Sequence, residues 1–194
     1  MKLYHGSPIN NIKKLKPSIS NHNNAYVYAT DNYILSILYS YNPLTRPNGF
    51  YTYFFNKDNQ LVYEEYFHDQ LKEIYKGKTG YIYEIKDNNF TKLENMPWIY
   101  IAEKEIQTNR IIVIKDIYEE IIKLENEGKI IILRYQDQDE KQRKQNKKII
   151  QNEITKTPKS NTNYLSFLNS HFPNLFKWKI LRNGGLFKLF SCFT

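Results

Sequence analysis

Two short motifs carry the side chains of this sequence that are best suited to chemistry. Residues 4–7 read Tyr-His-Gly-Ser and residues 27–30 read Val-Tyr-Ala-Thr, and each motif ends a short apolar run. The first supplies an imidazole, His5, which can donate and accept hydrogen bonds, followed by two small residues. The second supplies an aromatic face, Tyr28, on which a flat ring can stack. These residue types hold a ligand by hydrogen bonds and by stacking.

The segments around the two motifs predict strands and a helix that would position them. We expect strands at 1–4 and 25–28, joined by a loop rich in Asn, Pro and Ser. A helix is predicted over 31–41, because apolar residues recur there at helical spacing. Thr30 is its predicted N-cap residue.

The rest of the chain is expected to add short strands and two further helices. The predicted strands are 50–55, 81–85, 98–101, 110–114 and 129–134, the helices are 64–75 and 116–127, and a turn is expected at 42–49. Strands predominate before residue 115 without a regular alternation with helices, which indicates an α+β fold. The sequence contains neither GxGxxG nor a P-loop, so the usual phosphate-binding loops are absent.

Composition divides the chain into a nearly neutral body and a basic tail. With 194 residues, of which 41% are hydrophobic and 15% aromatic, the chain can bury a core of useful size. Residues 1–140 carry 17 basic and 19 acidic side chains, whereas residues 141–194 carry 11 basic and one acidic. We therefore predict a domain at 1–135 and a basic, aromatic, helical C-terminal extension at 136–194.

The extension allows more than one interpretation. Residues 136–148 contain almost no apolar side chain, which fits either an exposed helix or a mobile linker. From Tyr164 the chain is aromatic again, as in a helical cap packed on the body or an amphipathic surface binder. Its positive charge is either a solvated surface or an electrostatic footprint for nucleic acid or another anionic partner.

Further features of the sequence indicate the cellular compartment in which the protein is expected. No apolar run is long enough to span a membrane and the N-terminus lacks a signal-peptide pattern, so we expect a cytoplasmic protein. The single cysteine, Cys192, excludes an internal disulfide framework and fits a reducing compartment. The four histidines are scattered, so no metal site is predicted.

The first motif, with Leu3 before it, resembles the first motif of the ADP-ribosyltransferases of the His-Tyr-Glu class. This class includes the poly(ADP-ribose) polymerases and the diphtheria-toxin-like enzymes. The resemblance implies that His5 binds the ribose of NAD, while the Gly6 backbone and the Ser7 side chain hold the nicotinamide carboxamide. The second motif is similar to the class motif whose tyrosine packs on the nicotinamide, a role that would fall to Tyr28.

The same resemblance suggests two further site residues. Tyr39, eleven residues after Tyr28, sits where the polymerases carry a second stacking tyrosine. The class also uses a glutamate at the start of a late strand, and Glu103 and Glu105 both precede the predicted strand at 110–114. The resemblance favours Glu105 as the catalytic residue, with Glu103 orienting the acceptor. If the register slips by two residues, these roles exchange.

The resemblance covers residues 1–115 and implies a split, two-sheet core with NAD, as substrate, held between the sheets. It implies a toxin-like mono-ADP-ribosyltransferase, a nucleotide-binding glycosyltransferase that moves ADP-ribose to a protein or nucleic-acid acceptor and releases nicotinamide without a metal. An RNA 2′-phosphotransferase of the same fold is disfavoured, because such enzymes use several arginines and Arg46 is the one arginine in residues 1–100.

Non-enzymatic interpretations stay open beside this one. The domain could bind NAD, ADP-ribose or nucleic acid without turnover, since a fold can persist after its chemistry is lost. Individual residues also have structural alternatives. His5 could bond a neighbouring backbone carbonyl, Tyr39 could be a core residue, and Glu105 could be an exposed surface charge.

Overall fold

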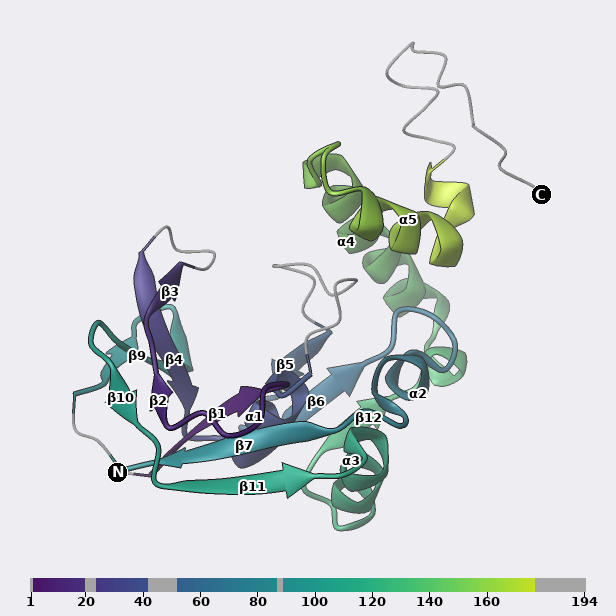
Figure 1. Cartoon of the computed structure of the whole chain (residues 1–194). Coiled ribbons are helices and arrows are strands. Elements are labelled where there is room, and N and C mark those ends of the chain that lie inside the picture. The colour runs from purple at the N-terminus through teal and green to yellow at the C-terminus, as the bar shows by residue number, and fades with distance from the viewer. Residues whose placement is uncertain (1, 20–23, 42–51, 87–88, 177–194) are drawn as a thin grey trace. The chain divides into compact units, whose positions relative to one another are not determined.

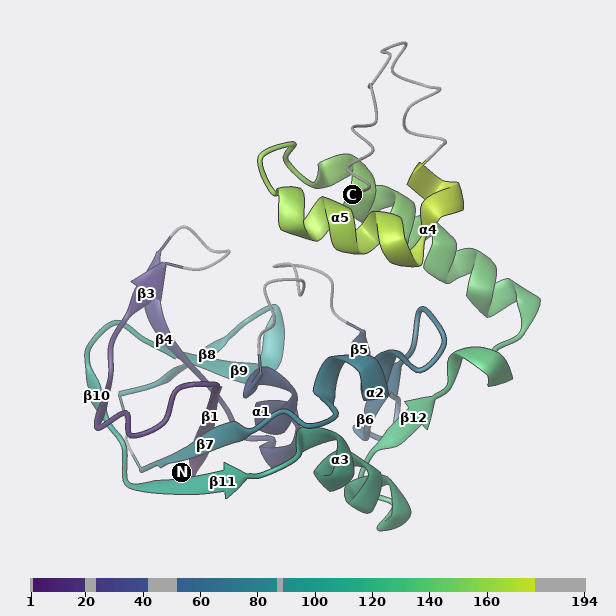
Figure 2. The same cartoon turned by 45° about the vertical axis from the view of Figure 1, so that its right-hand side comes forward.

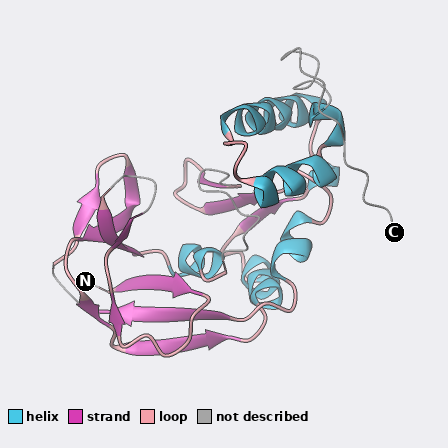
Figure 3. Ribbon diagram, turned by 45° about the horizontal axis from the view of Figure 1, so that its top comes forward, coloured by secondary structure: helices cyan, strands magenta, loops and turns pink. Residues whose placement is uncertain are grey.

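The structure, a computed structural model, comprises two compact units. The described residues are 2–19, 24–41, 52–86 and 89–176. The first unit extends to Tyr135 and combines helices with mostly antiparallel sheets, so its class is α+β (Figure 1; Figure 3). The described part of the second unit begins at Gln136 and is helical. The predicted turn at 42–49, the aromatic residues beyond 176 and Cys192 lie outside the described residues.

A seven-stranded sheet forms the framework of the first unit, and all its pairings are antiparallel. Its order is β11 (Arg110–Ile114), β7 (Gly80–Ile85), β1 (Leu3–Ser7), β4 (Ala25–Thr30), β9 (Met96–Ala102) and β8 (Thr91–Leu93), with β3 (Ser18–Ile19) paired to β4. Because β1 and β4 are neighbours, the two motifs of the sequence lie on adjacent strands (Figure 1).

Two smaller sheets and three helices complete this unit. The elements are a sheet of β5 (Tyr53–Phe55), β6 (Leu61–Glu64) and β12 (Ile131–Leu133), a ribbon of β2 (Lys14–Leu15) and β10 (Ile106–Gln107), and the helices α1 (Tyr33–Tyr39), α2 (Gln70–Tyr75) and α3 (Ile117–Asn126). β12 runs parallel to β6, whereas β5 is antiparallel to it. The ribbon and β3 and β8 were not expected from the sequence, because segments of two or three residues carry no readable alternation.

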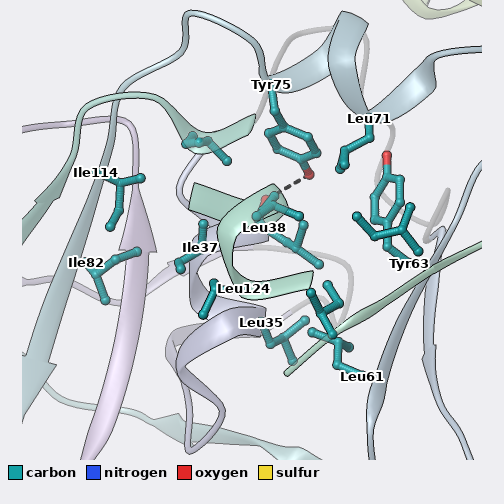
Figure 4. Packing of buried hydrophobic residues seen from close by; sticks show 14 of the residues in the cluster. Leu35, Ile37, Leu38, Leu61, Tyr63, Leu71, Tyr75, Ile82, Ile114 and Leu124 are labelled. Carbon is teal, nitrogen blue, oxygen red and sulfur yellow. Dashed lines mark hydrogen bonds between the residues drawn. The ribbon is translucent and has the colours of Figure 1, made fainter. Parts of the chain in front are cut away.

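The main hydrophobic core is built around α1. Its buried residues Leu35, Ile37 and Leu38 belong to one cluster with side chains from β6, α2, β7, β11 and α3 (Figure 4). The hydroxyl group of Tyr75, on α2, donates a hydrogen bond of 3.1 Å to the carbonyl of Leu38. Burial of apolar surface on several sides fixes α1 against β1, β4 and β7.

The start of α1 differs from the expectation. The helix begins at Tyr33 and its N-cap is Asn32, whose side chain accepts a 2.9 Å hydrogen bond from the Leu35 backbone N–H. Thr30, the predicted N-cap, remains in β4, and its hydroxyl oxygen accepts from the Asn32 backbone N–H at 3.1 Å. Both side chains therefore stabilise the strand-to-helix turn, with the cap two residues later than predicted.

The predicted helix over 64–75 is wrong in its first half. Glu64 ends strand β6, and α2 begins only at Gln70. The buried carboxylate of Glu65 holds the intervening turn by accepting hydrogen bonds from the backbone N–H groups of Leu71, at 3.0 Å, and Tyr135, at 3.2 Å. The first bond satisfies an N–H group in the first turn of α2, and the second joins this turn to the segment after β12.

The second unit contains α4 (Glu140–Lys156) and α5 (Thr162–His171), which lie beside one another (Figure 2). They follow the 3-10 turn η1 (Tyr135–Asp137). The side chain of Asp139 caps α4 by accepting a 2.7 Å hydrogen bond from the Gln142 backbone N–H. Among the helices of the described ranges, none is both long enough and apolar enough to cross a lipid bilayer.

Candidate functional site around His5 and Tyr28

A side-chain hydrogen bond joins the two motifs. His5 Nδ1 lies 2.7 Å from the backbone carbonyl oxygen of Tyr28. The register pair between β1 and β4 is Tyr4 with Thr30. One residue further along β1, the imidazole of His5 reaches the β4 backbone. The His5 side chain thus extends the connection between the strands beyond their backbone pairing.

This hydrogen bond determines which ring nitrogen of His5 donates and which can still accept. A carbonyl oxygen can only accept, so Nδ1 of His5 carries the proton and donates. In the neutral ring, Nε2 then has a free lone pair and acts as an acceptor. Burial lowers the pKa of His5 below 6.5, and the hydrogen bond to the Tyr28 carbonyl opposes this shift. No hydrogen bond to Nε2 is formed within the described part of the chain, so a hydroxyl group of a ligand could donate to it.

The Tyr28 ring leaves β4 on the side of the sheet that faces α1. Tyr28 packs against the α1 cluster, and its ring meets the edge of Tyr26 at a centroid distance of 6.0 Å. Leu3 belongs to a second cluster, and strand alternation places His5 on the same face as Leu3. His5 therefore approaches Tyr28 through the tyrosine's backbone carbonyl, while the two side chains start from opposite faces of the sheet.

Gly6 is required by the packing of α1. A Cβ atom at this position would overlap the carbonyl oxygen of Ser36 and would lie 2.7 Å from the backbone nitrogen of Ser40. Gly80, on the neighbouring strand β7, is equally close to the Ser40 side chain. Because Ser36 and Ser40 are small and four residues apart, they present one narrow face of the α1 segment to the two glycines. The glycine of the first motif therefore has a structural role.

Ser7 and the loop after it are held in place from the strand β7. Ser7 is buried, and its hydroxyl oxygen accepts a 3.1 Å hydrogen bond from the backbone N–H of Ile9. The hydroxyl group of Tyr83 donates to the Ile9 carbonyl at 2.7 Å and accepts from the Ile12 backbone N–H at 3.1 Å. Thr108 adds a 2.8 Å hydrogen bond to the Ile12 carbonyl. This loop is thus anchored beside the first motif.

Tyr39 links α1 to the smaller sheet. It is the last residue of α1, and its hydroxyl group is hydrogen-bonded to the hydroxyl group of Tyr53 on β5. The two rings meet edge to face, with centroids 5.9 Å apart. Tyr39 and Tyr28 both border the α1 cluster. The hydrogen bond to Tyr53 therefore links the end of α1 to β5.

The two candidate glutamates lie at the turn between β9 and β10. Glu103 is exposed there. Glu105, immediately before β10, is half-exposed and forms ion pairs of 3.7 Å with Lys14 and with Lys16 on the β2 side of the ribbon. The Glu105 carboxylate is therefore already paired with two lysines.

The sequence did not predict the residues that pack against the first motif. Tyr83 is completely buried and faces His5 across the β1–β7 pairing, with ring centroids 6.4 Å apart. Among 17 tyrosines, nothing in the sequence distinguishes it. Ser36 and Ser40 did leave a signal, because two small residues four apart in an otherwise apolar helix indicate close packing.

Taken together, the site offers a neutral imidazole acceptor, two small residues and an aromatic ring around the β1–β4 contact. Such groups can bind hydroxyl groups and a flat heterocycle. No family model, no curated protein and no solved structure matches this chain.

Proposed function

We propose that the first unit is an NAD-dependent mono-ADP-ribosyltransferase domain. The observation that carries this proposal is the hydrogen bond from His5 Nδ1 to the Tyr28 carbonyl, because it connects the two motifs and leaves Nε2 as an acceptor. In the proposed complex, Nε2 accepts a hydrogen bond from a ribose hydroxyl group of NAD. The Gly6 backbone and the Ser7 hydroxyl group hold the carboxamide, and Tyr28 and Tyr39 stack on the nicotinamide.

In the proposed reaction, the bond between the nicotinamide nitrogen and the ribose carbon breaks, and nicotinamide leaves as a neutral molecule. An acceptor nucleophile attacks the opposite face of the sugar, forms the new bond with inversion and loses its proton to solvent. Positive charge develops on the ribose in the transition state, and a nearby carboxylate stabilises it. We assign this role to Glu105, with Glu103 as the residue that orients the acceptor. The acceptor is a protein or a nucleic acid.

A second candidate function is a module that binds NAD or ADP-ribose without turnover. One observation favours it. The Glu105 carboxylate is paired with Lys14 and Lys16, so part of its charge is already compensated. A fold of this kind can retain ligand binding after losing its chemistry.

Nicotinamide release from NAD distinguishes the two candidates. The wild type is compared with Glu105→Gln and Glu103→Gln, with and without cell lysate as a source of acceptor. The transferase predicts release that falls by at least about 100-fold in Glu105→Gln, while NAD binding persists. If the wild type binds NAD but releases no nicotinamide, the domain is a binding module. Equal release from all three proteins would contradict the assignment of Glu105.

A further inference from the structure

The helix α4 carries a cluster of exposed lysines. Because an α-helix has 3.6 residues per turn, positions 141, 144 and 148 recur on one side and position 147 borders them. All four side chains are exposed, and together we call them the α4 lysine face: Lys141, Lys144, Lys147 and Lys148. The buried residues of the same helix, Asn146, Ile150 and Ile154, line an adjoining side, which Lys147 borders.

No ion pair neutralises the lysines of this face within the described residues. Of the two acidic residues in α4, Glu140 lies four residues before Lys144 and so shares the face, but it forms no ion pair with these lysines in that part of the chain. The four lysines therefore outnumber the one carboxylate on this side. Glu153 lies nearer the other end and is partly buried, and burial raises its pKa. An arrangement of several like charges on one exposed face attracts a polyanion.

We propose that the α4 lysine face binds the phosphate backbone of double-stranded DNA. The inference is independent of the proposed NAD chemistry. Lysine is a point charge that contacts phosphate without reading bases, so binding is expected to be insensitive to sequence. The major groove of B-form DNA is wide enough to admit an α-helix, whereas that of A-form RNA is deep and narrow. A single strand is disfavoured, because α4 contains no aromatic residue on which bases could stack.

Other polyanions fit this face less well. Helices that bind membrane surfaces insert aromatic or aliphatic side chains next to their basic residues. Among the residues of α4, the one large hydrophobic side chain that is exposed is Ile149. Protein interfaces depend on buried aromatic or arginine anchors, which the four lysines do not supply. A face that offers charge alone matches the regular phosphates of a duplex.

The test measures binding of the full-length protein to a fluorescent DNA duplex of arbitrary sequence at increasing salt. If all four lysines contact phosphates, log K should fall with log salt concentration with a slope of about −3.6. Between about 50 mM and about 200 mM salt, this slope corresponds to a loss of affinity on the order of 100-fold. Replacing the four lysines by glutamine should remove most of the slope and lower the affinity at low salt by at least about tenfold.

A matched variant controls for overall charge. This control variant replaces four exposed lysines of the first unit by glutamine, namely Lys57, Lys72, Lys76 and Lys115. It removes the same charge and should leave the slope unchanged. Circular dichroism confirms that both variants are folded. The proposal is overturned if the wild type does not bind the duplex, if both variants lose affinity equally, or if the face variant binds like the wild type. Tighter binding to an RNA duplex or to anionic vesicles would also overturn it.

Discussion

His5 and Tyr28 are separated by 23 residues in the sequence, yet a 2.7 Å hydrogen bond joins the imidazole of one to the backbone carbonyl of the other. This bond fixes the proton on Nδ1 and leaves Nε2 as an acceptor. The same contact is structural, since it connects β1 to β4, and chemical, since it determines what His5 can bind.

The first prediction concerns the titration of His5. Burial lowers its pKa below 6.5, the value for an unfolded chain. Below pH 6.5 the unfolded state therefore binds more protons at this site than the folded state does. The stability contributed by neutral His5 should be complete above pH 6.5 and should decrease as the pH falls toward the folded-state pKa.

Denaturant unfolding of the wild type and of His5→Asn over a series of pH values measures this effect. An asparagine amide can still donate to the Tyr28 carbonyl but does not titrate. The difference in unfolding free energy between the two proteins should therefore change in favour of the wild type as the pH rises. A difference that stays constant with pH would show that His5 titrates normally.

The second prediction concerns Gly6. Substitution by alanine should destabilise the protein by about 3 kcal/mol, because the added methyl group overlaps backbone atoms of α1, which cannot simply rotate away. Gly77→Ala is the comparison. Gly77 has open space around its Cβ position but a φ of 71°, so it should cost only about 1 kcal/mol of backbone strain. Thermal unfolding decides, and equal costs for the two variants would argue against close packing of α1 on β1.

The third prediction concerns Tyr83. Its buried hydroxyl group bonds the backbone of Ile9 and Ile12, so Tyr83→Phe leaves these groups without partners and should cost about 1–3 kcal/mol. The loop after β1 should also become more sensitive to limited proteolysis. Tyr81→Phe, on the same strand, is the control, because the Tyr81 hydroxyl group has no hydrogen bond within the described residues. An equal response of the two variants would mean that Tyr83 does not anchor the loop.

The sequence predicted the helices and strands better than the long-range contacts that hold them in place. Strand β11 coincides with the predicted 110–114, and α3 differs from the predicted 116–127 by one residue at each end. In both segments, runs of apolar residues with clear spacing and a cap determine the structure locally. The turn before α2 could not be predicted, because the carboxylate of Glu65 organises it through a bond to Tyr135, 70 residues away.

In the candidate site, too, the strands could be predicted locally, whereas the contacts between side chains could not. The strands that carry His5 and Tyr28 follow from short apolar runs, although β1 extends to Ser7 and β4 to Thr30, so both residues lie inside their strands. The bond between them depends on the pairing of β1 with β4. The partners of Tyr39 and Glu105 also depend on tertiary structure. Tyr53 comes from β5, which was predicted as a strand but not as a partner of α1, and the two lysines come from the β2 side of a ribbon too short to be predicted.

The most direct test of the central claim is calorimetric titration of NAD into the wild type and into His5→Asn. The substitution keeps a donor for the Tyr28 carbonyl and removes Nε2, so it separates the structural role of His5 from ligand binding. We expect both proteins to unfold at similar temperatures, with NAD affinity at least about tenfold weaker in the variant. Unchanged affinity in His5→Asn, or no NAD binding by the wild type, would contradict the proposed site.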